Sequence, residues 1–338
     1  MNEKPIFVVG TPRSGTTLTA KILGLHSNIF MPGETHYFDD IVSRSNQLGD
    51  PSSASSLARV AERLYTLYDR YYEPCDQERI EKIFPVCGDL EMALHGCRDY
   101  ACIFDRFMNL QMEAVSKKRW GNNAPRDIFS YRRIREYFPD AKFVVCVRDI
   151  RAFLLSYQGK WKVTGEAHVE RLKKLYHPVI TSYLWKSTMR QVESLAKEVP
   201  TTDRVIVRYE DLVSNPATTV RMICGTIEEP FEPSMLQVTT HNSSDEQQER
   251  GIFSASIGRW RTRLTPEEIS VGQHIAKREL AWLGYPNVDA SPGLVGVLGI
   301  WLKTPVALEK ALHATRGVTG PHIPYLAKRI GALFGVNR

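Results

Sequence analysis

The hydrophobic pattern at the start of the chain is a short apolar run at residues 7–9, a loop bounded by Gly10 and Gly15, and apolar residues at helical spacing over 18–25. A run rich in β-branched side chains predicts a strand, and the spacing that follows predicts a helix. At such a junction, several backbone N–H groups and the positive end of a helix dipole point to one place. The stretch therefore predicts a binding site for an anionic group such as a phosphate or sulfate.

Further short apolar runs predict strands at residues 29–31, 143–147 and 204–208, in addition to the first strand at 6–10. Segments with helical spacing separate these runs. Strands that alternate with helices are typical of α/β folds, in which ligands bind in the crevice beyond the carboxyl ends of parallel strands. We expect a single α/β domain with a central, mainly parallel sheet flanked by helices.

The loop after the first strand nearly fits the ATP- and GTP-binding pattern G-x-x-x-x-G-K-[ST]. Gly10 and Gly15 are in register, but Thr16 stands where the pattern has its lysine. That lysine neutralises the β- and γ-phosphates of a nucleotide, and threonine carries no charge. The cation of this loop is Arg13 instead. A glycine-rich turn without a ligand is the alternative interpretation.

The string Pro-Arg-Ser-Gly-Thr-Thr at residues 12–17 resembles the sulfotransferase family whose donor is 3'-phosphoadenosine 5'-phosphosulfate (PAPS). In that family, a Pro-[Lys/Arg]-x-Gly-Thr-Thr loop holds the 5'-phosphosulfate. The resemblance extends over about residues 5–286. It implies a P-loop-like sulfotransferase fold, PAPS as donor and adenosine 3',5'-bisphosphate (PAP) as product. The donor-binding residues that it implies in this loop are Arg13, Ser14, Gly15, Thr16 and Thr17.

The string Glu-Thr-His-Tyr-Phe-Asp at residues 34–39 is similar to the Glu-x-His-Phe-Phe-Asp string of heparan-type sulfotransferases. An acceptor hydroxyl must lose its proton as it attacks sulfur, and a carboxylate with a raised pKa can accept that proton. The resemblance implies Glu34 as the base. His36 is the competing base, because some relatives use a histidine. In a purely structural alternative, Glu34 caps a helix that starts near Thr35.

Residues 119–125 are similar to a family string, Gly-Asp-Lys-Thr-Pro, whose lysine approaches the sulfuryl group. In this chain the corresponding residue is Asn123. Either Asn123 supplies a neutral hydrogen bond, or the stabilisation of charge falls wholly on Arg13.

Arg148 follows the predicted strand 143–147, and Ser156 lies eight residues later in the next predicted helix. In the family, this arginine and serine hold the 3'-phosphate of the donor. A guanidinium suits a terminal phosphate because its fork forms two parallel charge-assisted hydrogen bonds. In the structural alternative, Arg148 pairs with Asp149 or another carboxylate.

A late segment at residues 253–261 resembles the family loop that closes over the donor and contacts its 3'-phosphate or adenine. The resemblance implies Ser256, Gly258 and Arg259 as further donor-binding residues. The string Arg-Tyr-Glu-Asp-Leu at residues 208–212 is also similar to a family string, and we expect it to support the nucleotide site.

The formal net charge is +6, and the basic residues are dispersed along the chain. A nucleic-acid partner would need a denser basic stripe, so we expect none. The surplus charge suits an anionic donor, an anionic acceptor or a membrane surface, or it is a solvated surface without a partner. The six cysteines form no C-x-x-C pair and indicate no disulfide framework; Cys146 and Cys224 have the apolar neighbours of buried free thiols.

We expect a sulfotransferase domain over residues 1–286 and a helical, apolar tail over 287–338. Residues 41–118 show no catalytic spacing and are assigned to acceptor binding, because such insertions commonly carry substrate recognition. The part of the tail at 293–338 is either a surface that rests on lipid or on a second subunit, or a set of helices packed on the core. No leader and no apolar run of membrane-spanning length are visible, which favours a cytoplasmic protein, with a membrane-peripheral one as the alternative.

The sequence thus predicts transfer of a sulfuryl group from PAPS to the hydroxyl of a carbohydrate, glycolipid or small metabolite, by in-line attack. It indicates no metal, because Arg13 and backbone dipoles supply the positive charge. The alternatives are an ATP-dependent small-molecule kinase with a degenerate loop and a non-catalytic nucleotide-binding protein.

Overall fold

The computed structural model describes residues 4–71, 74–159, 175–239, 251–315 and 322–335. Within them, one parallel sheet has the strand order β2-β3-β1-β4-β5. The strands are β1 (Ile6–Gly10), β2 (Ile29–Phe30), β3 (Arg119–Asn123), β4 (Lys142–Val147) and β5 (Arg204–Arg208). All strands point the same way, so their carboxyl ends share one edge of the sheet.

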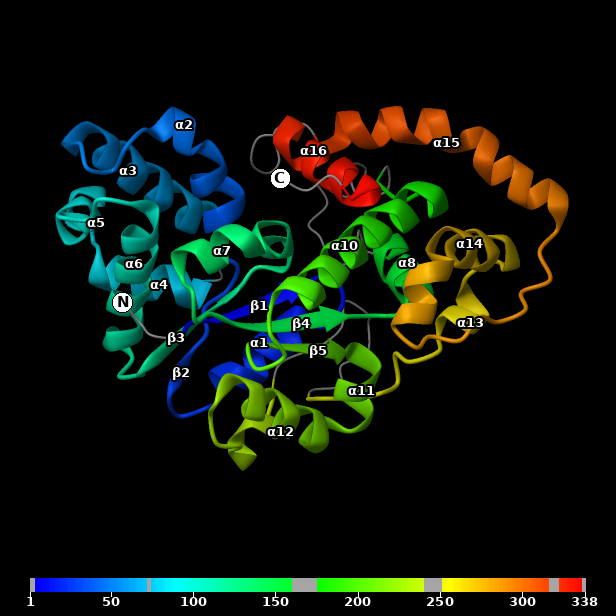
Figure 1. Cartoon of the computed structure of the whole chain (residues 1–338), viewed down its shortest axis with the longest axis horizontal. Helices are drawn as coiled ribbons and strands as arrows, with labels where there is room; N and C mark the ends of the chain where they lie inside the picture. The colour runs from blue at the N-terminus through cyan, green and yellow to red at the C-terminus, as the bar shows by residue number, and fades with distance from the viewer. Residues whose placement is uncertain (1–3, 72–73, 160–174, 240–250, 316–321, 336–338) are drawn as a thin grey trace.

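Helices cover both faces of the sheet (Figure 1), with α1, α11 and α12 on one face and α7, α8 and α10 on the other. The helices before β4 are α1 (Thr16–Gly24), α2 (Ser45–Leu48), α3 (Ala54–Tyr71), α4 (Pro74–Ile83), α5 (Cys87–Leu94), α6 (Tyr100–Ala114) and α7 (Tyr131–Tyr137). Those after β4 are α8 (Ile150–Gln158), α10 (Pro178–Glu198), α11 (Tyr209–Ser214), α12 (Pro216–Ile227), α13 (Trp260–Arg263), α14 (Pro266–Trp282), α15 (Leu294–Thr315) and α16 (His322–Phe334). Short turns of other helix types are η1 (Tyr37–Ile41), η2 (Val42–Arg44), η3 (Pro125–Ser130) and η5 (Pro233–Leu236).

The buried strands explain why the sheet needs two covering layers. Along β1, Ile6 and Val8 pack with α1 and α12, whereas Phe7 and Val9 enter the larger core that includes α6 and α10. Every residue of β4 is buried. Strands that are apolar on both sides form stable parallel sheets only when helices cover both faces.

The four predicted strands are confirmed, and the parallel α/β architecture is as predicted. The strand that the sequence did not reveal is β3, whose sequence is Arg-Trp-Gly-Asn-Asn. Only Trp120 is large and apolar in this strand, and none of its residues is β-branched, so the usual strand signal is missing. The strand forms because it pairs with β1 on one side and β2 on the other.

The cysteine prediction was wrong in one respect, because Cys97 and Cys102 form a disulfide. Their Cα atoms are 5.4 Å apart across the turn that leads from α5 into α6, a separation that a disulfide spans readily. Spacing alone did not reveal this turn. Cys146 and Cys224 are buried free thiols as predicted, and burial raises the pKa of Cys146 to about 12.

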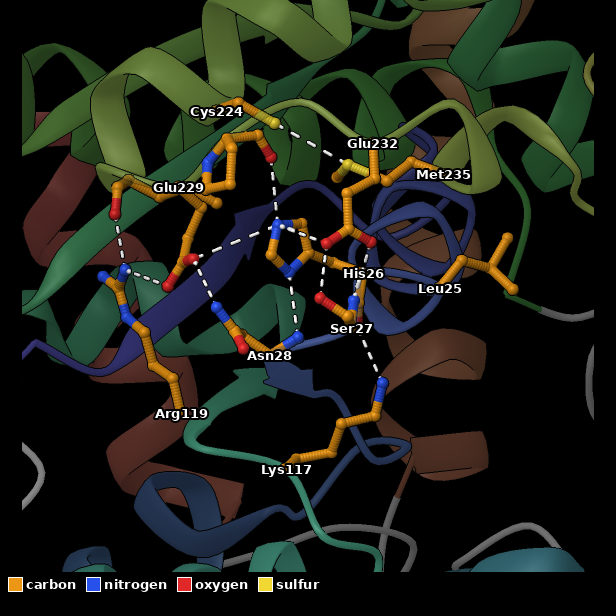
Figure 2. A network of polar contacts seen from close by, with 12 residues as sticks. Leu25, His26, Ser27, Asn28, Lys117, Arg119, Cys224, Glu229, Glu232 and Met235 are labelled. Atoms are coloured by element: carbon orange, nitrogen blue, oxygen red, sulfur yellow. Dashed lines mark hydrogen bonds and ion pairs between the residues drawn. The ribbon is translucent and has the colours of Figure 1, made fainter.

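A polar network around His26 closes the edge of the sheet where the strands begin (Figure 2). His26 Nδ1 accepts a hydrogen bond from the backbone N–H of Asn28 at 3.0 Å, and Nε2 lies 2.9 Å from the carbonyl oxygen of Pro230. Since Nδ1 is the acceptor, the ring proton resides on Nε2 and is donated to Pro230. Glu229 and Glu232 flank the ring at 3.9 and 3.5 Å. The network joins the end of α1 to the segment before η5.

Candidate active site

The loop between β1 and α1 forms the tight turn that the glycine spacing predicted. Gly10 has a φ of 143°, and a Cβ atom there would lie 2.1 Å from the carbonyl oxygen of Cys146 in β4. Ser14 Oγ lies 2.5 Å from the carbonyl oxygen of Thr11 and 3.0 Å from that of Cys146, so its hydroxyl fixes the loop to β4. The backbone N–H of Ser14 also donates to the carbonyl oxygen of Thr11, at 3.1 Å, so the donor contact expected for Ser14 stays a prediction.

The N-terminus of α1 opens at the carboxyl edge of the sheet. Gly15 occupies the N-cap position in a left-handed conformation, and no side chain of the described residues caps the helix. Thr16 is buried in the first turn, and Thr17 is exposed. The first N–H groups of a helix have no partner within it, so they are available to an anion here.

Arg13 lies on this loop, and the side chain of Arg148 contacts its backbone. Arg13 has a φ of 72°, and its Nε donates to Ser156 Oγ in α8 at 3.0 Å. Arg148 Nη1 donates to the backbone carbonyl of Arg13 at 3.0 Å. The sequence predicted that Ser156 acts together with Arg148. In the structure, Ser156 binds the side chain of Arg13, and Arg148 binds the backbone carbonyl of Arg13. The alternative in which Arg148 pairs with Asp149 is wrong, because Asp149 caps α8 and binds the side chain of Arg151.

Aromatic side chains hold Arg148 in place. Its guanidinium carbon lies 4.2 Å from the centre of the Tyr209 ring, and its carbonyl oxygen accepts from Trp185 Nε1 at 2.9 Å. The Tyr209 hydroxyl lies 2.9 Å from Ser256 Oγ, which brings the late loop to the same place. Glu210 accepts a hydrogen bond from the backbone N–H of Asp149 at 3.2 Å. The string at residues 208–212 thus supports the segment around Arg148, as expected.

The residues of the late loop, 253–261, differ in whether they contact the residues around Arg148. Ser256 is joined to it through Tyr209. Gly258 has a φ of 79° and open space around its Cα, and Arg259 Nε donates to the carbonyl of Ala255 within its own loop. The donor contacts expected for Gly258 and Arg259 stay predictions.

Glu34 and His36 lie on a segment that is anchored to the neighbouring strand. Thr35 Oγ1 donates to Asn122 Oδ1 in β3 at 2.8 Å, and Asn122 Nδ2 donates to Asp127 Oδ2 at 2.8 Å. Glu34 Oε2 lies 3.8 Å from His36 Nε2, with 41% of the Glu34 side chain exposed but only 16% of that of His36. The accessible carboxylate and the more buried imidazole therefore lie together near the carboxyl end of β3.

The helix at this segment is the short η1, whose N-cap is His36, and no capping side chain is recorded there among the described residues. The alternative role of Glu34 as a helix cap is therefore wrong.

Three buried polar atoms at the same edge of the sheet have no hydrogen-bond partner among the described residues. They are Thr11 Oγ1, Asn123 Oδ1 and Arg148 Nε. These residues stand at the ends of β1, β3 and β4, which are adjacent in the sheet. Buried polar groups normally find partners, so these three atoms are candidates for contact with a polar ligand. An anion with several acceptor oxygens fits the donors Thr11 and Arg148.

The C-terminal helix α16 joins this region, which the sequence did not predict. The Tyr325 ring centre lies 4.7 Å from the guanidinium carbon of Arg126, and Arg126 Nη1 lies 3.7 Å from Asp39. Lys328 Nζ donates to Ser130 Oγ at 3.3 Å, and Arg329 Nη1 donates to the carbonyl of Leu184 in α10 at 2.9 Å. The sequence could not predict these contacts of α16, because the residues that form them are far apart in the chain and match no motif. The one indication was that Arg126 follows closely after Asn123, which matches a position of the family string.

A cavity of about 930 Å³ lies elsewhere, between the start of α3 and α5. It is within the segment 41–118 that we assigned to acceptor binding, but none of the predicted site residues lines it. Residues along its wall are Pro51, Leu57, Val86, Met92, His95 and Arg98.

Residues 5–233 match the model of the sulfotransferase family. The match spans more than half of the 338 residues, so the chain belongs to this family and is a sulfotransferase-family enzyme. The resemblance inferred from the glycine loop is thereby confirmed.

Solved structures of sulfotransferase domains have the same fold. The domain from the curacin biosynthetic pathway is 19% identical, with a TM-score of 0.54, and the alignment covers 84% of this chain and 99% of that domain. The domain from the olefin synthase of Synechococcus PCC 7002 is 20% identical, with a TM-score of 0.50, and the coverage is 81% and 96%.

Curated relatives match over short stretches. An uncharacterized protein of Aquifex aeolicus is 52% identical over 42 residues, which are 12% of this chain. A 2-C-methyl-D-erythritol 2,4-cyclodiphosphate synthase of Symbiobacterium thermophilum is 33% identical over 67 residues, which are 20% of this chain. The chain spans only 6% and 43% of the lengths of these two relatives.

Proposed function

We propose that the enzyme transfers a sulfuryl group from PAPS to an acceptor hydroxyl and leaves PAP. When bound, PAPS supplies a sulfur centre that carries a good leaving group, the bisphosphate. The observation that carries the proposal is the meeting of Arg13 and Arg148 beside the uncapped N-terminus of α1, where the nucleotide triphosphatase pattern would place a lysine.

Arg13 and the first turn of α1 hold the 5'-phosphosulfate end of the donor. Arg13 is oriented by Ser156, and Thr16 and Thr17 begin the helix whose N–H groups face the anion. These groups stabilise the negative charge that builds up on the leaving phosphate, because preorganised donors need no rearrangement as the charge develops.

Arg148 binds the 3'-phosphate of the donor. Its guanidinium packs on the Tyr209 ring, Trp185 binds its backbone carbonyl oxygen, and Nε is buried with no partner among the described residues. Ser256, Gly258 and Arg259 lie on the loop that reaches this phosphate or the adenine. A rigid guanidinium with a free Nε is suited to forked binding of a terminal phosphate.

Glu34 accepts the proton of the acceptor hydroxyl. Its carboxylate is the accessible member of the Glu34–His36 pair, and Thr35 anchors the segment to β3. His36 is the second candidate for the base. Asn123 Oδ1 is buried without a partner among the described residues, and its side chain provides a neutral contact where relatives carry lysine.

The acceptor is a carbohydrate, a glycolipid or a small metabolite. Its binding site is formed by the segment around Glu34, by Arg126 and by Tyr325 of α16. In this proposal, residues 1–286 are the catalytic domain with 41–118 as acceptor-binding insertion, and 287–338 are a tail that closes the acceptor side. The enzyme works in the cytoplasm, where PAPS is available.

Calorimetric titration of the full chain with PAP, and separately with ATP and Mg²⁺, tests the donor assignment. We expect PAP to bind with a dissociation constant (Kd) well below that of ATP, because the site offers two arginines but no P-loop lysine. A preference for ATP would support a kinase instead. Binding of neither nucleotide by folded protein would contradict the proposed donor site.

A further inference from the structure

The outer face of α15 carries an unusual number of exposed apolar side chains. Leu294, Val295 and Leu302 are 81%, 85% and 79% exposed. Further exposed side chains of the same helix are Leu298, Trp301, Val306, Leu308 and Leu312. Soluble proteins rarely leave so continuous an apolar surface open to water unless something binds it.

The inner face of α15 does not account for these residues. Val297 and Ile300 are the half-buried apolar side chains that pack on the core, where they contact Val179, Val271 and Ile275. The helix thus turns a narrow stripe to the protein and the larger part of its apolar surface outward. Figure 1 shows α15 along one rim of the molecule, so this surface is accessible to a large partner.

Charge on the helix favours an anionic partner. Lys303 and Lys310 are seven residues apart, so they lie on one side of the helix, and both are exposed. They border the side that carries Leu298 and Leu302. Glu309, next to Lys310, is the one acidic residue of α15, and residues 294–308 contain none, so the lysines outnumber the acidic side chains of the helix. An apolar face with Leu and Trp, bordered by lysines, is typical of a helix that lies in a membrane interface.

We propose that the outer face of α15 binds the surface of an anionic lipid bilayer. Leu294, Leu298 and Leu302 enter the boundary of the acyl chains, and Trp301 lies at its edge. Lys303 and Lys310 bind the lipid phosphates. None of the described helices is long and apolar enough to cross a membrane, so the attachment is peripheral.

The same tail is fixed to the acceptor side of the enzyme. Helix α16 packs against α10, as α15 does, and places Tyr325 on Arg126. Ile330 and Phe334 of α16 are also exposed. Bilayer binding would thus bring the acceptor side close to hydroxyls at the lipid surface. The lipid-binding inference itself does not depend on the proposed sulfuryl transfer.

Sedimentation of the full chain with vesicles tests the inference. One set contains phosphatidylcholine with phosphatidylglycerol, and the other contains phosphatidylcholine alone. We expect binding to the anionic vesicles and weak binding to the neutral ones. The double variant Leu298→Glu/Leu302→Glu should bind roughly tenfold or more weakly. Lys303→Gln/Lys310→Gln should lose about fivefold in affinity for each lysine.

The matched control is Leu25→Glu/Met222→Glu, which adds the same charge at exposed apolar positions at the end of α1 and on α12. It should bind vesicles like the wild type. All variants should bind PAP with the Kd of the wild type in calorimetric titration. This result would show that they are folded and would separate the vesicle test from the donor assignment.

Three outcomes would overturn the inference. Equal binding to both kinds of vesicle would exclude the role of the lysines. Equal loss of binding in the control variant would show that α15 is not the contact. Absence of vesicle binding together with a dimer that Leu298→Glu/Leu302→Glu dissociates, measured by light scattering, would show that a second copy of the chain covers this face.

Discussion

Replacement of Arg148 by alanine removes the group that we assign to the 3'-phosphate of the donor. The residue is half-buried, the Nε of its side chain has no partner among the described residues, and the guanidinium packs on the Tyr209 ring. The replacement should therefore weaken donor binding strongly but lower the free energy of unfolding only slightly.

The magnitude follows from the hydrogen bonds that the guanidinium can form. Hydrogen bonds to charged groups contribute about 1.5–3 kcal/mol each, and a forked arginine forms two. Because Arg148 is only half-buried, the lower value applies, which gives about 3 kcal/mol for the pair. The Kd for PAP should then rise about 150-fold in Arg148→Ala. Arg148→Lys keeps the charge but not the fork, so its Kd should lie between the two.

The assay is calorimetric titration with PAP, accompanied by urea unfolding of each variant. Arg132→Ala is the matched control, because Arg132 forms an exposed ion pair with Glu198, near the end of the sheet opposite the site. Its Kd should equal that of the wild type. If Arg148→Ala is folded and binds PAP as tightly as the wild type, the phosphate assignment is wrong.

Other residues give predictions of their own. In an assay with a panel of hydroxyl acceptors, Glu34→Gln should lower the rate of PAP formation by about a hundredfold or more, without weakening PAP binding. Normal turnover would instead indicate His36 as the base. Gly15→Ala should weaken PAP binding in calorimetry, because φ is 88° there and a Cβ would lie 2.6 Å from the Tyr209 ring that holds Arg148; unchanged affinity would show that this packing is dispensable. Burial raises the pKa of Asp127 in the folded state well above 3.8, the value expected in the unfolded chain. The stability that Asp127 contributes is therefore fully present below about pH 3.8 and is lost as the pH rises through the raised pKa of the folded state. Asp127→Asn should flatten the pH dependence of urea unfolding above about pH 4, and an unchanged slope would contradict the cause.

The parts of the fold that the sequence predicts are those encoded locally. The β-branched run before Gly10 and the apolar run of β4 each carry their own signal. Strand β3 carries no such signal, because its polar residues become a strand only between two neighbours. The disulfide between Cys97 and Cys102 likewise depends on a turn that spacing does not specify.

The candidate site shows the same division. Glycine spacing and the adjacent arginine identify the loop and Arg13, and the strand end identifies Arg148. Side-chain pairing is different, because it depends on distances between segments. Ser156 binds Arg13 rather than Arg148, and Tyr325 reaches Arg126 from the other end of the chain. Neither contact follows from the order of residues.

The most direct test of sulfuryl transfer uses PAPS labelled with radioactive sulfur, incubated with the full chain and a panel of carbohydrates, glycolipids and small hydroxylated metabolites. We expect label to appear on one class of acceptor, with PAP released in equal amount, and both signals to be nearly abolished in Glu34→Gln. If labelled ATP instead transfers phosphate to an acceptor from the same panel, while PAPS stays intact, the protein is not a sulfotransferase in function.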